Sequence, residues 1–316
     1  MLSSILYSNQ SEAESLSDHT PVSNDSTLSI SSPERTGKSV LNKMEVEAVV
    51  PDISNVSMPI KEPQSEYEIV DGVLKEELDY NSNIERYSNS EISPLGLIGS
   101  TDRRVRVTDT TTFPHRAITY LYVRWPNGEA NRCTGFIINT NTVVTAGHCV
   151  YSHTKGGWAT RITVRPGANG ADNFPYGAFE STKLFSVKGF TENEVESNDY
   201  GAIKISGSFP ASIGSFGYGV ATESNFGGEF ARVTGYPTDA NKPLYTQWMH
   251  SGTIDLSILG FAFHDADTTG GQSGSPMYLK ENNIARAIHT GDGKPKNVGV
   301  RITSGVFENL QLWANQ

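Results

Sequence analysis

The sequence predicts an all-β protein over roughly its C-terminal two-thirds, and three observations support this fold class. From residue 116 onward, short runs of β-branched and aromatic residues alternate with polar residues, as strands with one buried face do. Glycine, proline and asparagine separate these runs at short intervals. Helical spacing of apolar residues appears only near the C-terminus. Many short strands at regular spacing indicate a sandwich or barrels.

Eleven segments have the strand pattern. They are 116–125, 134–140, 142–146, 161–164, 183–187, 200–205, 231–236, 246–256, 275–279, 285–290 and 299–303. After the last of them, Val306, Leu310 and Trp313 share one helical face, and Ser304 is placed to cap the first turn. We therefore expect one short C-terminal helix after the strands.

The N-terminal third has a different composition. Residues 1–90 are rich in serine, glutamate, aspartate and asparagine and have no sustained period, so we expect a largely disordered segment. Residues 1–95 hold 17 of the 35 acidic residues but only 6 of the 25 basic ones, which places the net charge of −10 in this part of the chain.

Composition also argues against several classes of protein. No apolar run approaches the roughly 20 residues of a membrane span, and no basic stripe with interleaved aromatics indicates nucleic-acid binding. The histidines lack the HExxH spacing, and two cysteines are too few for a structural zinc site. We therefore predict no cofactor and no metal.

The stretch TTGGQSGSP, residues 268–276, carries the strongest candidate for chemistry, Ser273. Gly271 and Gly274 free the backbone to approach a ligand, so that the N–H groups of Gly271 and Ser273 can form an oxyanion hole. Taken alone, the stretch also fits a glycine and serine turn between two strands. TVVTAGHCV (142–150) adds His148 as a base, and ESNDYGAIKI (196–205) adds Asp199 to orient it.

These three motifs, in the order histidine, aspartate, serine, resemble the chymotrypsin-like serine proteases, and specifically their glutamyl endopeptidase branch. The resemblance runs from about Gly96 to Gln316. It implies a protease domain over 96–316, built as two six-stranded antiparallel barrels with the active site in the cleft between them. It also implies that Ser273 is the nucleophile, His148 the general base and acid, and Asp199 the residue that orients the histidine.

Specificity is open between two interpretations. In the resembling branch, the residues at Thr268 and His289 contact a glutamate side chain of the substrate, and both residue types can hydrogen-bond a carboxylate. Asp267, however, stands six residues before Ser273, where trypsin-like enzymes carry the aspartate that binds lysine or arginine. A third possibility is a catalytically silent relative of the fold that only binds its partners.

Cys133 and Cys149 are 16 residues apart and could be two free thiols. The resemblance implies instead a disulfide beside His148, and hence an oxidising, extracellular compartment. The opening residues lack the basic and apolar regions of a signal peptide, although we expect secretion.

The acidic segment 1–95 then becomes a candidate pro-segment that inhibits the domain until it is removed near Gly96. Glu91 lies close enough to that boundary for self-cleavage. Trypsin-like proenzymes are activated through an aspartate directly before the serine, but here that residue is Gln272. Activation therefore works differently. The expected partners are protein or peptide substrates, with no nucleic acid and no membrane, and we expect a monomer.

Overall fold

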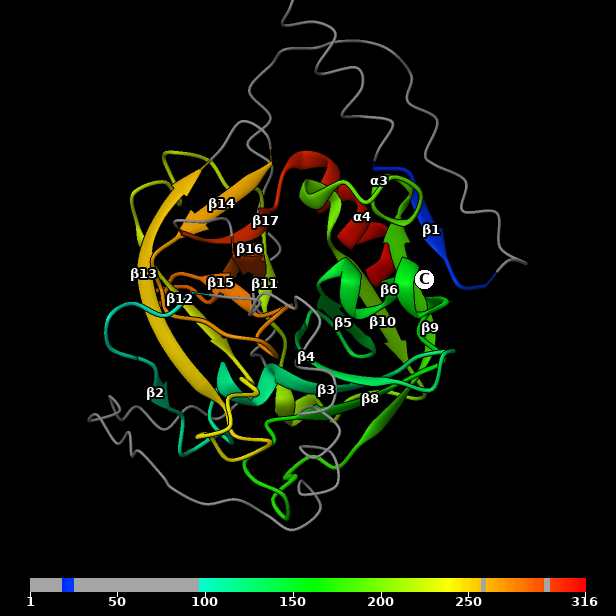
Figure 1. Ribbon diagram of the computed structural model, residues 1–316, viewed down its shortest axis with the longest axis horizontal. Coiled ribbons are helices and arrows are strands. Elements are labelled where there is room, and N and C mark those ends of the chain that lie inside the picture. Colours follow the sequence, from blue (N-terminus) through cyan, green and yellow to red (C-terminus); the bar gives the residue numbers. More distant parts are fainter. Residues whose placement is uncertain (1–18, 26–96, 257–259, 293–295) are drawn as a thin grey trace, which may run out of the picture.

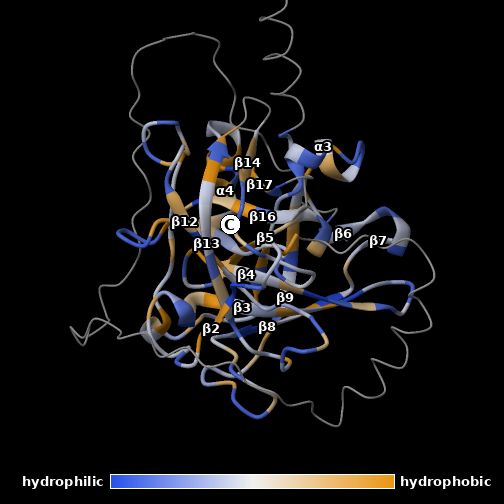
Figure 2. Ribbon diagram, turned by 60° about the vertical axis from the view of Figure 1, so that its left-hand side comes forward, coloured by the Kyte–Doolittle hydropathy of each residue, from blue (hydrophilic) through white to orange (hydrophobic). Residues whose placement is uncertain are grey.

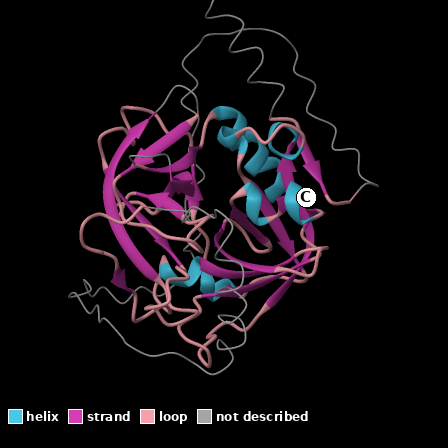
Figure 3. Ribbon diagram, in the orientation of Figure 1, coloured by secondary structure: helices cyan, strands magenta, loops and turns pink. Residues whose placement is uncertain are grey.

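The structure is a computed structural model that describes residues 19–25, 97–256, 260–292 and 296–316. Most of the predicted pro-segment, including Glu91, lies outside these residues, as does the predicted boundary residue Gly96. The described chain folds mainly into two β-barrels that lie side by side (Figure 1). Strands dominate both barrels and helices are few and short (Figure 3).

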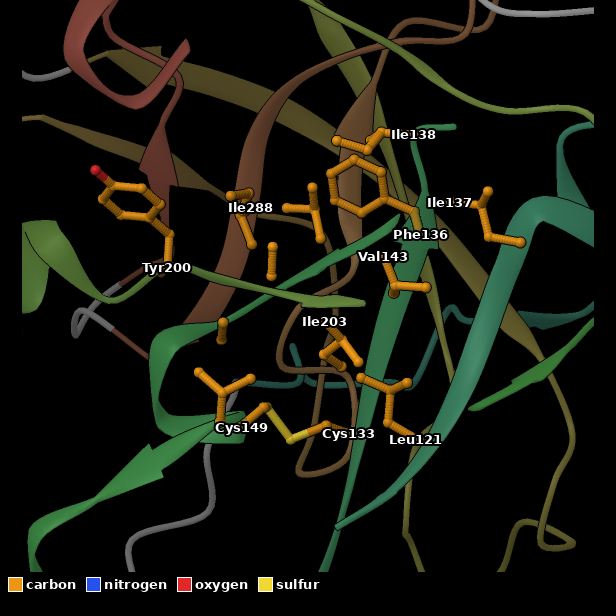
Figure 4. Packing of buried hydrophobic residues seen from close by; sticks show 14 of the residues in the cluster. Leu121, Cys133, Phe136, Ile137, Ile138, Val143, Cys149, Tyr200, Ile203 and Ile288 are labelled. Carbon is orange, nitrogen blue, oxygen red and sulfur yellow. A yellow bond between two sulfur atoms is a disulfide. The ribbon is translucent and has the colours of Figure 1, made fainter. Parts of the chain in front are cut away.

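The first barrel closes through six antiparallel strands. The strands pair in the cyclic order β3, β8, β9, β10, β5 and β4. Their bounds are β3 Ile118–Arg124, β4 Ala130–Ile137, β5 Thr142–Thr145, β8 Arg161–Pro166, β9 Phe179–Val187 and β10 Gly201–Ile205. Leu121, Phe136, Val143 and Ile203 project from different strands into one packed core (Figure 4).

The second barrel closes in the same way, in the cyclic order β12, β13, β14, β17, β16 and β15. Its strands are β12 Phe230–Gly235, β13 Trp248–Leu256, β14 Phe261–His264, β15 Pro276–Tyr278, β16 Ile284–Asp292 and β17 Asn297–Arg301. Hydrophobic and hydrophilic residues are interspersed along the strands of both barrels (Figure 2). The predicted architecture of two six-stranded barrels is therefore confirmed.

Short elements complete the described chain. Five further strands are β1 Pro21–Ser23, β2 Val105–Arg106, β6 Tyr151–Ser152, β7 Gly157–Trp158 and β11 Gly217–Tyr218. The 3-10 turns are η2 His115–Ala117, η3 Gly147–Cys149, η4 His153–Lys155, η5 Glu196–Asn198 and η6 Ala211–Ile213, and the α-helices are α3 Lys188–Thr191 and α4 Ser304–Ala314. No described helix is long and apolar enough to cross a membrane.

The C-terminal helix forms as predicted, but its cap lies one residue earlier. Thr303, not Ser304, is the N-cap, and its hydroxyl accepts a hydrogen bond from the N–H of Val306. The helix packs its apolar face against the first barrel, where Trp313 stacks on Phe185 with 5.7 Å between ring centres. Ser304 instead occupies the first helical position.

Candidate active site

His148 and Asp199 meet because two paired strands end beside each other. β5 leads into η3, which carries His148, and Asp199 ends η5 just before β10. Thr145 of β5 lies opposite Gly201 of β10, so the turn after one strand adjoins the turn before the other. The imidazole Nδ1 lies 2.7 Å from Asp199 Oδ2, and the backbone N–H of His148 donates to Oδ1 at 2.7 Å.

This pairing sets the electrostatics of the imidazole. Burial of His148 disfavours its charged form, but the negative charge of Asp199 and the hydrogen bond to it outweigh burial and raise the pKa of His148 above its ordinary value. The hydrogen bond to Nδ1 leaves Nε2 free to act as a base. Nε2 is buried and has no hydrogen-bond partner among the described residues.

Ser273 lies where the two barrels meet. Its carbonyl oxygen accepts a hydrogen bond of 2.8 Å from the N–H of Thr134, which belongs to β4 of the first barrel. Its side chain is buried, and the hydroxyl donates to the carbonyl oxygen of Thr290 at 3.3 Å rather than to His148. The structure thus joins His148 to Asp199 but does not form the serine–histidine hydrogen bond. Such bonds often tighten only when substrate is present.

The two predicted oxyanion donors are free. In a trans peptide the N–H points away from the preceding carbonyl. The carbonyl of Gly270 accepts hydrogen bonds from the N–H and hydroxyl of Thr238, and the carbonyl of Gln272 accepts one from the N–H of Ser275. The N–H groups of Gly271 and Ser273 therefore point the other way, and neither has an acceptor within the described part of the chain.

The two glycines of the predicted motif are required by this backbone. Gly271 has φ +87°, and a Cβ there would lie 2.5 Å from the carbonyl oxygen of Tyr236. Gly274 has φ +86°, and a Cβ there would lie 2.0 Å from the carbonyl oxygen of Thr134. A side chain at either position would shift the loop that carries Ser273.

The two residues predicted to determine specificity are both fully buried. Thr268 directly precedes residues 269–275, which carry Ser273 and form the serine loop. Its hydroxyl has no hydrogen-bond partner among the described residues. His289 lies on β16, where its Nδ1 is 3.1 Å from Nε2 of His264, and its own Nε2 has no partner there either. Burial and the neighbouring His264 hold the pKa of His289 well below its ordinary value, so the ring is neutral.

Asp267 has its carboxylate occupied by another segment. Oδ1 accepts from the N–H of Gly99 and Oδ2 from the N–H of Arg103, each at 2.9 Å, and the Arg103 side chain adds an ion pair at 3.3 Å. Burial alone would raise the pKa of Asp267, but these hydrogen bonds outweigh burial and lower it. The carboxylate anchors residues 99–103 and is only 2% exposed.

Sequence reasoning missed a buried charge network around Arg104. Its guanidinium makes two-point ion pairs with Asp102 and Asp239, and it also donates to the Thr269 hydroxyl at 2.6 Å and to Gln272 Oε1 at 3.0 Å. Gln272 lies between the two oxyanion donors. Arg104 therefore ties the loop of Ser273 to the segment that begins the domain. No sequence signal marks this network, because its members are scattered from residue 102 to residue 272.

Cys133 and Cys149 form the predicted disulfide, which crosses from β4 to the turn of His148 (Figure 4). With His148 they are also the group of potential metal ligands that the described residues contain. Because both sulfurs are in the disulfide, neither is a thiolate that could bind a metal. These residues do not fit a metal centre.

Comparisons with known proteins agree with the fold and the motifs. The family model described as Trypsin matches residues 118–311. A protein of Bacillus subtilis (strain 168) named extracellular metalloprotease is 44% identical over 229 residues, covering 71% of this chain and 72% of the relative. A glutamyl endopeptidase of Bacillus licheniformis is 40% identical over 229 residues, covering 69% of each.

A solved structure of a Glu endopeptidase in complex with MPD has the same fold, with a TM-score of 0.62 at 24% identity, and covers 70% of this chain and 100% of its own. The name of the Bacillus subtilis relative includes the word metalloprotease. In this chain the group of Cys133, His148 and Cys149 does not fit a metal ion, because both cysteines are in a disulfide. Matches to a trypsin family model over more than half of the chain, and to a glutamyl endopeptidase, agree with the closed barrels. The chain belongs to the trypsin-like family of serine endopeptidases, with glutamyl endopeptidases among its relatives.

Proposed function

We propose that this endopeptidase works through Ser273, His148 and Asp199. The observation that carries the assignment is the doubly hydrogen-bonded pair of His148 and Asp199 next to a serine loop with two free amide donors. Rotation of the Ser273 hydroxyl from Thr290 to His148 Nε2 would let the imidazole take its proton while the oxygen attacks the scissile carbonyl.

The N–H groups of Gly271 and Ser273 would then stabilise the oxyanion of the tetrahedral intermediate. His148 gives its proton to the leaving amine, which leaves an acyl-enzyme on Ser273. A water molecule, deprotonated by the same imidazole, releases the acid product and restores the serine.

We propose further that the enzyme prefers glutamate, or aspartate, before the scissile bond. The Thr268 hydroxyl and His289 Nε2 are buried polar atoms without partners, which is costly unless a ligand satisfies them. If His264 donates to Nδ1 of His289, the second nitrogen of His289 carries a hydrogen that a carboxylate can accept. Asp267 is already bound by Gly99 and Arg103, which weakens the case for lysine or arginine.

Cleavage of four peptides that differ only in glutamate, aspartate, lysine or arginine before the scissile bond tests this preference. We expect kcat/KM to be highest for glutamate, and a preference for lysine or arginine would contradict the assignment. A serine-directed phosphonate should label the active chain and not Ser273→Ala. Labelling that persists in Ser273→Ala would remove the nucleophile assignment. A processed form, cut near Gly96, that is unlabelled and inactive would favour a silent binding protein.

We propose that the protein is a secreted precursor in which residues 1–95 inhibit the domain until cleavage near Gly96. The Cys133–Cys149 disulfide supports an oxidising compartment, and the name of the Bacillus subtilis relative includes the word extracellular. Substrates are proteins or peptides, and the active form is a monomer. Mass spectrometry of the active form should find its first residue within 90–98, and a start far from this range would contradict the precursor boundary.

A further inference from the structure

A short piece of the N-terminal third is bound to the protease domain. Residues 21–23 form β1, which pairs antiparallel with the end of β9, so that Pro21 lies opposite Val187 and Ser23 opposite Phe185. Figure 1 shows β1 in blue along the outer side of the first barrel, away from the second barrel. The barrel is already closed by six strands, and β1 is a seventh that covers an edge of β9.

Backbone hydrogen bonds fix the register of this strand. The N–H of Lys188 donates to the carbonyl oxygen of Thr20 at 2.8 Å, and the N–H of Asn24 donates to the carbonyl oxygen of Leu184 at 3.1 Å. Because antiparallel pairs alternate, Val22 and Ser186 form the hydrogen-bonded pair between these two points. Pro21 then falls at a position that needs no N–H, and its side chain is buried.

His19 extends the contact into a site built by the domain. Its Nδ1 lies 2.9 Å from the hydroxyl of Tyr200, and its carbonyl oxygen accepts from the side chain of Asn309 at 2.8 Å. The ring lies against Gly305 of α4, where a Cβ would approach it to 3.0 Å. Asn309 also donates to the Tyr200 hydroxyl, so α4 and Tyr200 form one binding surface for His19.

The contact reaches both neighbours of a proposed catalytic residue. Tyr200 follows Asp199 in the chain, and Asn198, which precedes it, has its side-chain nitrogen 3.3 Å from His19 Nδ1. His19 thus contacts the turn that holds Asp199.

We propose that residues 19–25 are a docking strand that holds the N-terminal third on the edge of β9, and that the strand stays bound after the chain is cut between residues 26 and 96. The occupant of this sheet edge is therefore the chain's own N-terminal fragment, bound by strand addition and by His19. If β1 dissociated, the backbone groups of β9 that pair with it would be exposed and unpaired. The role of this strand in a precursor rests on the proposed function, whereas its binding to β9 does not.

The test uses the full chain carrying Ser273→Ala, with the recognition site of a specific protease inserted within residues 84–95. After cutting under native conditions, we expect the N-terminal fragment to co-elute with the domain in size-exclusion chromatography. Val22→Pro, which removes the N–H that pairs with Ser186, should weaken retention about tenfold or more. Ser23→Ala is the matched control, because its hydroxyl bonds only within the strand to the Asp25 carbonyl.

Asn309→Ala tests the domain side, because it removes the donor to the His19 carbonyl and should also release the fragment. Hydrogen exchange of the uncut chains gives a second measurement, in which Val22→Pro should lose protection at the Ser186 and Lys188 amides while β10 keeps its own. Separation of the unmodified fragment after cutting, or equal retention with Val22→Pro, would overturn the docking strand. Neither result depends on catalysis, so failure of the proposed function would be seen separately in peptide cleavage.

Discussion

Asp199 accepts two hydrogen bonds from His148, and the two bonds have different effects. The hydrogen bond to the backbone N–H fixes the turn, and the hydrogen bond to Nδ1 fixes which ring nitrogen is left free to act as a base. A base acts only in its neutral form, so cleavage should rise with pH as His148 loses its proton. Because Asp199 raises the pKa of His148, this rise should lie above pH 6.5, the ordinary value.

Asp199→Asn should therefore lower kcat by about 10⁴-fold, because an amide favours the wrong tautomer of the imidazole. It should also move the acidic limb of kcat/KM to lower pH, since the negative charge that raised the pKa is gone. The pH profile of peptide cleavage measures both effects. Asp255→Asn, at an exposed ion pair with Lys296, is the control. An acidic limb unmoved in Asp199→Asn would mean that another group titrates.

The Thr268 hydroxyl offers a sharper test of specificity than His289, because replacing His289 would also leave His264 without its partner. Thr268→Val keeps the shape of the side chain and removes the hydroxyl. A hydrogen bond to a charged group contributes about 1.5–3 kcal/mol, so kcat/KM for glutamate peptides should fall roughly 10- to 150-fold. Peptides with glutamine at that position should lose much less, and an equal loss on both would contradict a carboxylate contact.

The strands were predictable because burial of one face makes apolar and polar residues alternate along a strand. All eleven predicted segments overlap barrel strands, and the strand of the two barrels that the sequence did not reveal is β14, Phe261–His264. Its four residues are too few to show alternation. The cap of α4 was misplaced because threonine and serine are both preferred capping residues. In the structure the backbone of Thr303 is extended, whereas Ser304 is already helical.

The serine loop is a separate element whose shape depends on Gln272. Gln272 Oε1 accepts from Arg104 and from the N–H of Thr269, and both bonds hold the loop between the oxyanion donors. In this chain the neutral Gln272 makes this contact with an internal arginine, which explains how the loop is held without an aspartate before the serine.

Gln272→Leu should lower kcat about 10- to 100-fold with little change in KM, because misplaced oxyanion donors affect the transition state more than substrate binding. Arg104 keeps its ion pairs with Asp102 and Asp239 in this variant, so the fold should survive. Gln272→Glu restores an acceptor beside Arg104 and should recover much of the rate. Steady-state kinetics of the three forms decide the matter, and a change confined to KM would argue against a positioning role.

The proposed site lies where the two barrels touch. The pair of His148 and Asp199 belongs to the first barrel and the serine loop to the second. The contacts that hold the halves together were not predictable, because Thr134 is an ordinary strand threonine in sequence. Likewise nothing in the polar stretch 19–25 indicates a strand, since its pairing partner lies more than 150 residues away.

Thr134 joins the first barrel to the serine loop of the second. Its hydroxyl donates to the carbonyl of Gly271 at 2.8 Å and accepts from the N–H of Tyr236 at 2.9 Å, while its own N–H binds the carbonyl of Ser273. Thr134→Val preserves the strand and the backbone contact but leaves two buried polar groups unpaired. We expect a loss of about 2 kcal/mol in the free energy of unfolding and a fall in kcat of roughly 10- to 100-fold.

Thr160→Val is the matched control, because Thr160 is exposed and its hydroxyl donates only to the carbonyl of Arg124. Urea unfolding and peptide cleavage at a temperature where both variants are fully folded separate stability from catalysis. If Thr134→Val loses stability but keeps its kcat, the second barrel holds the serine loop by itself. If kcat falls in the fully folded variant, the first barrel supplies part of the geometry of the oxyanion hole as well as the base.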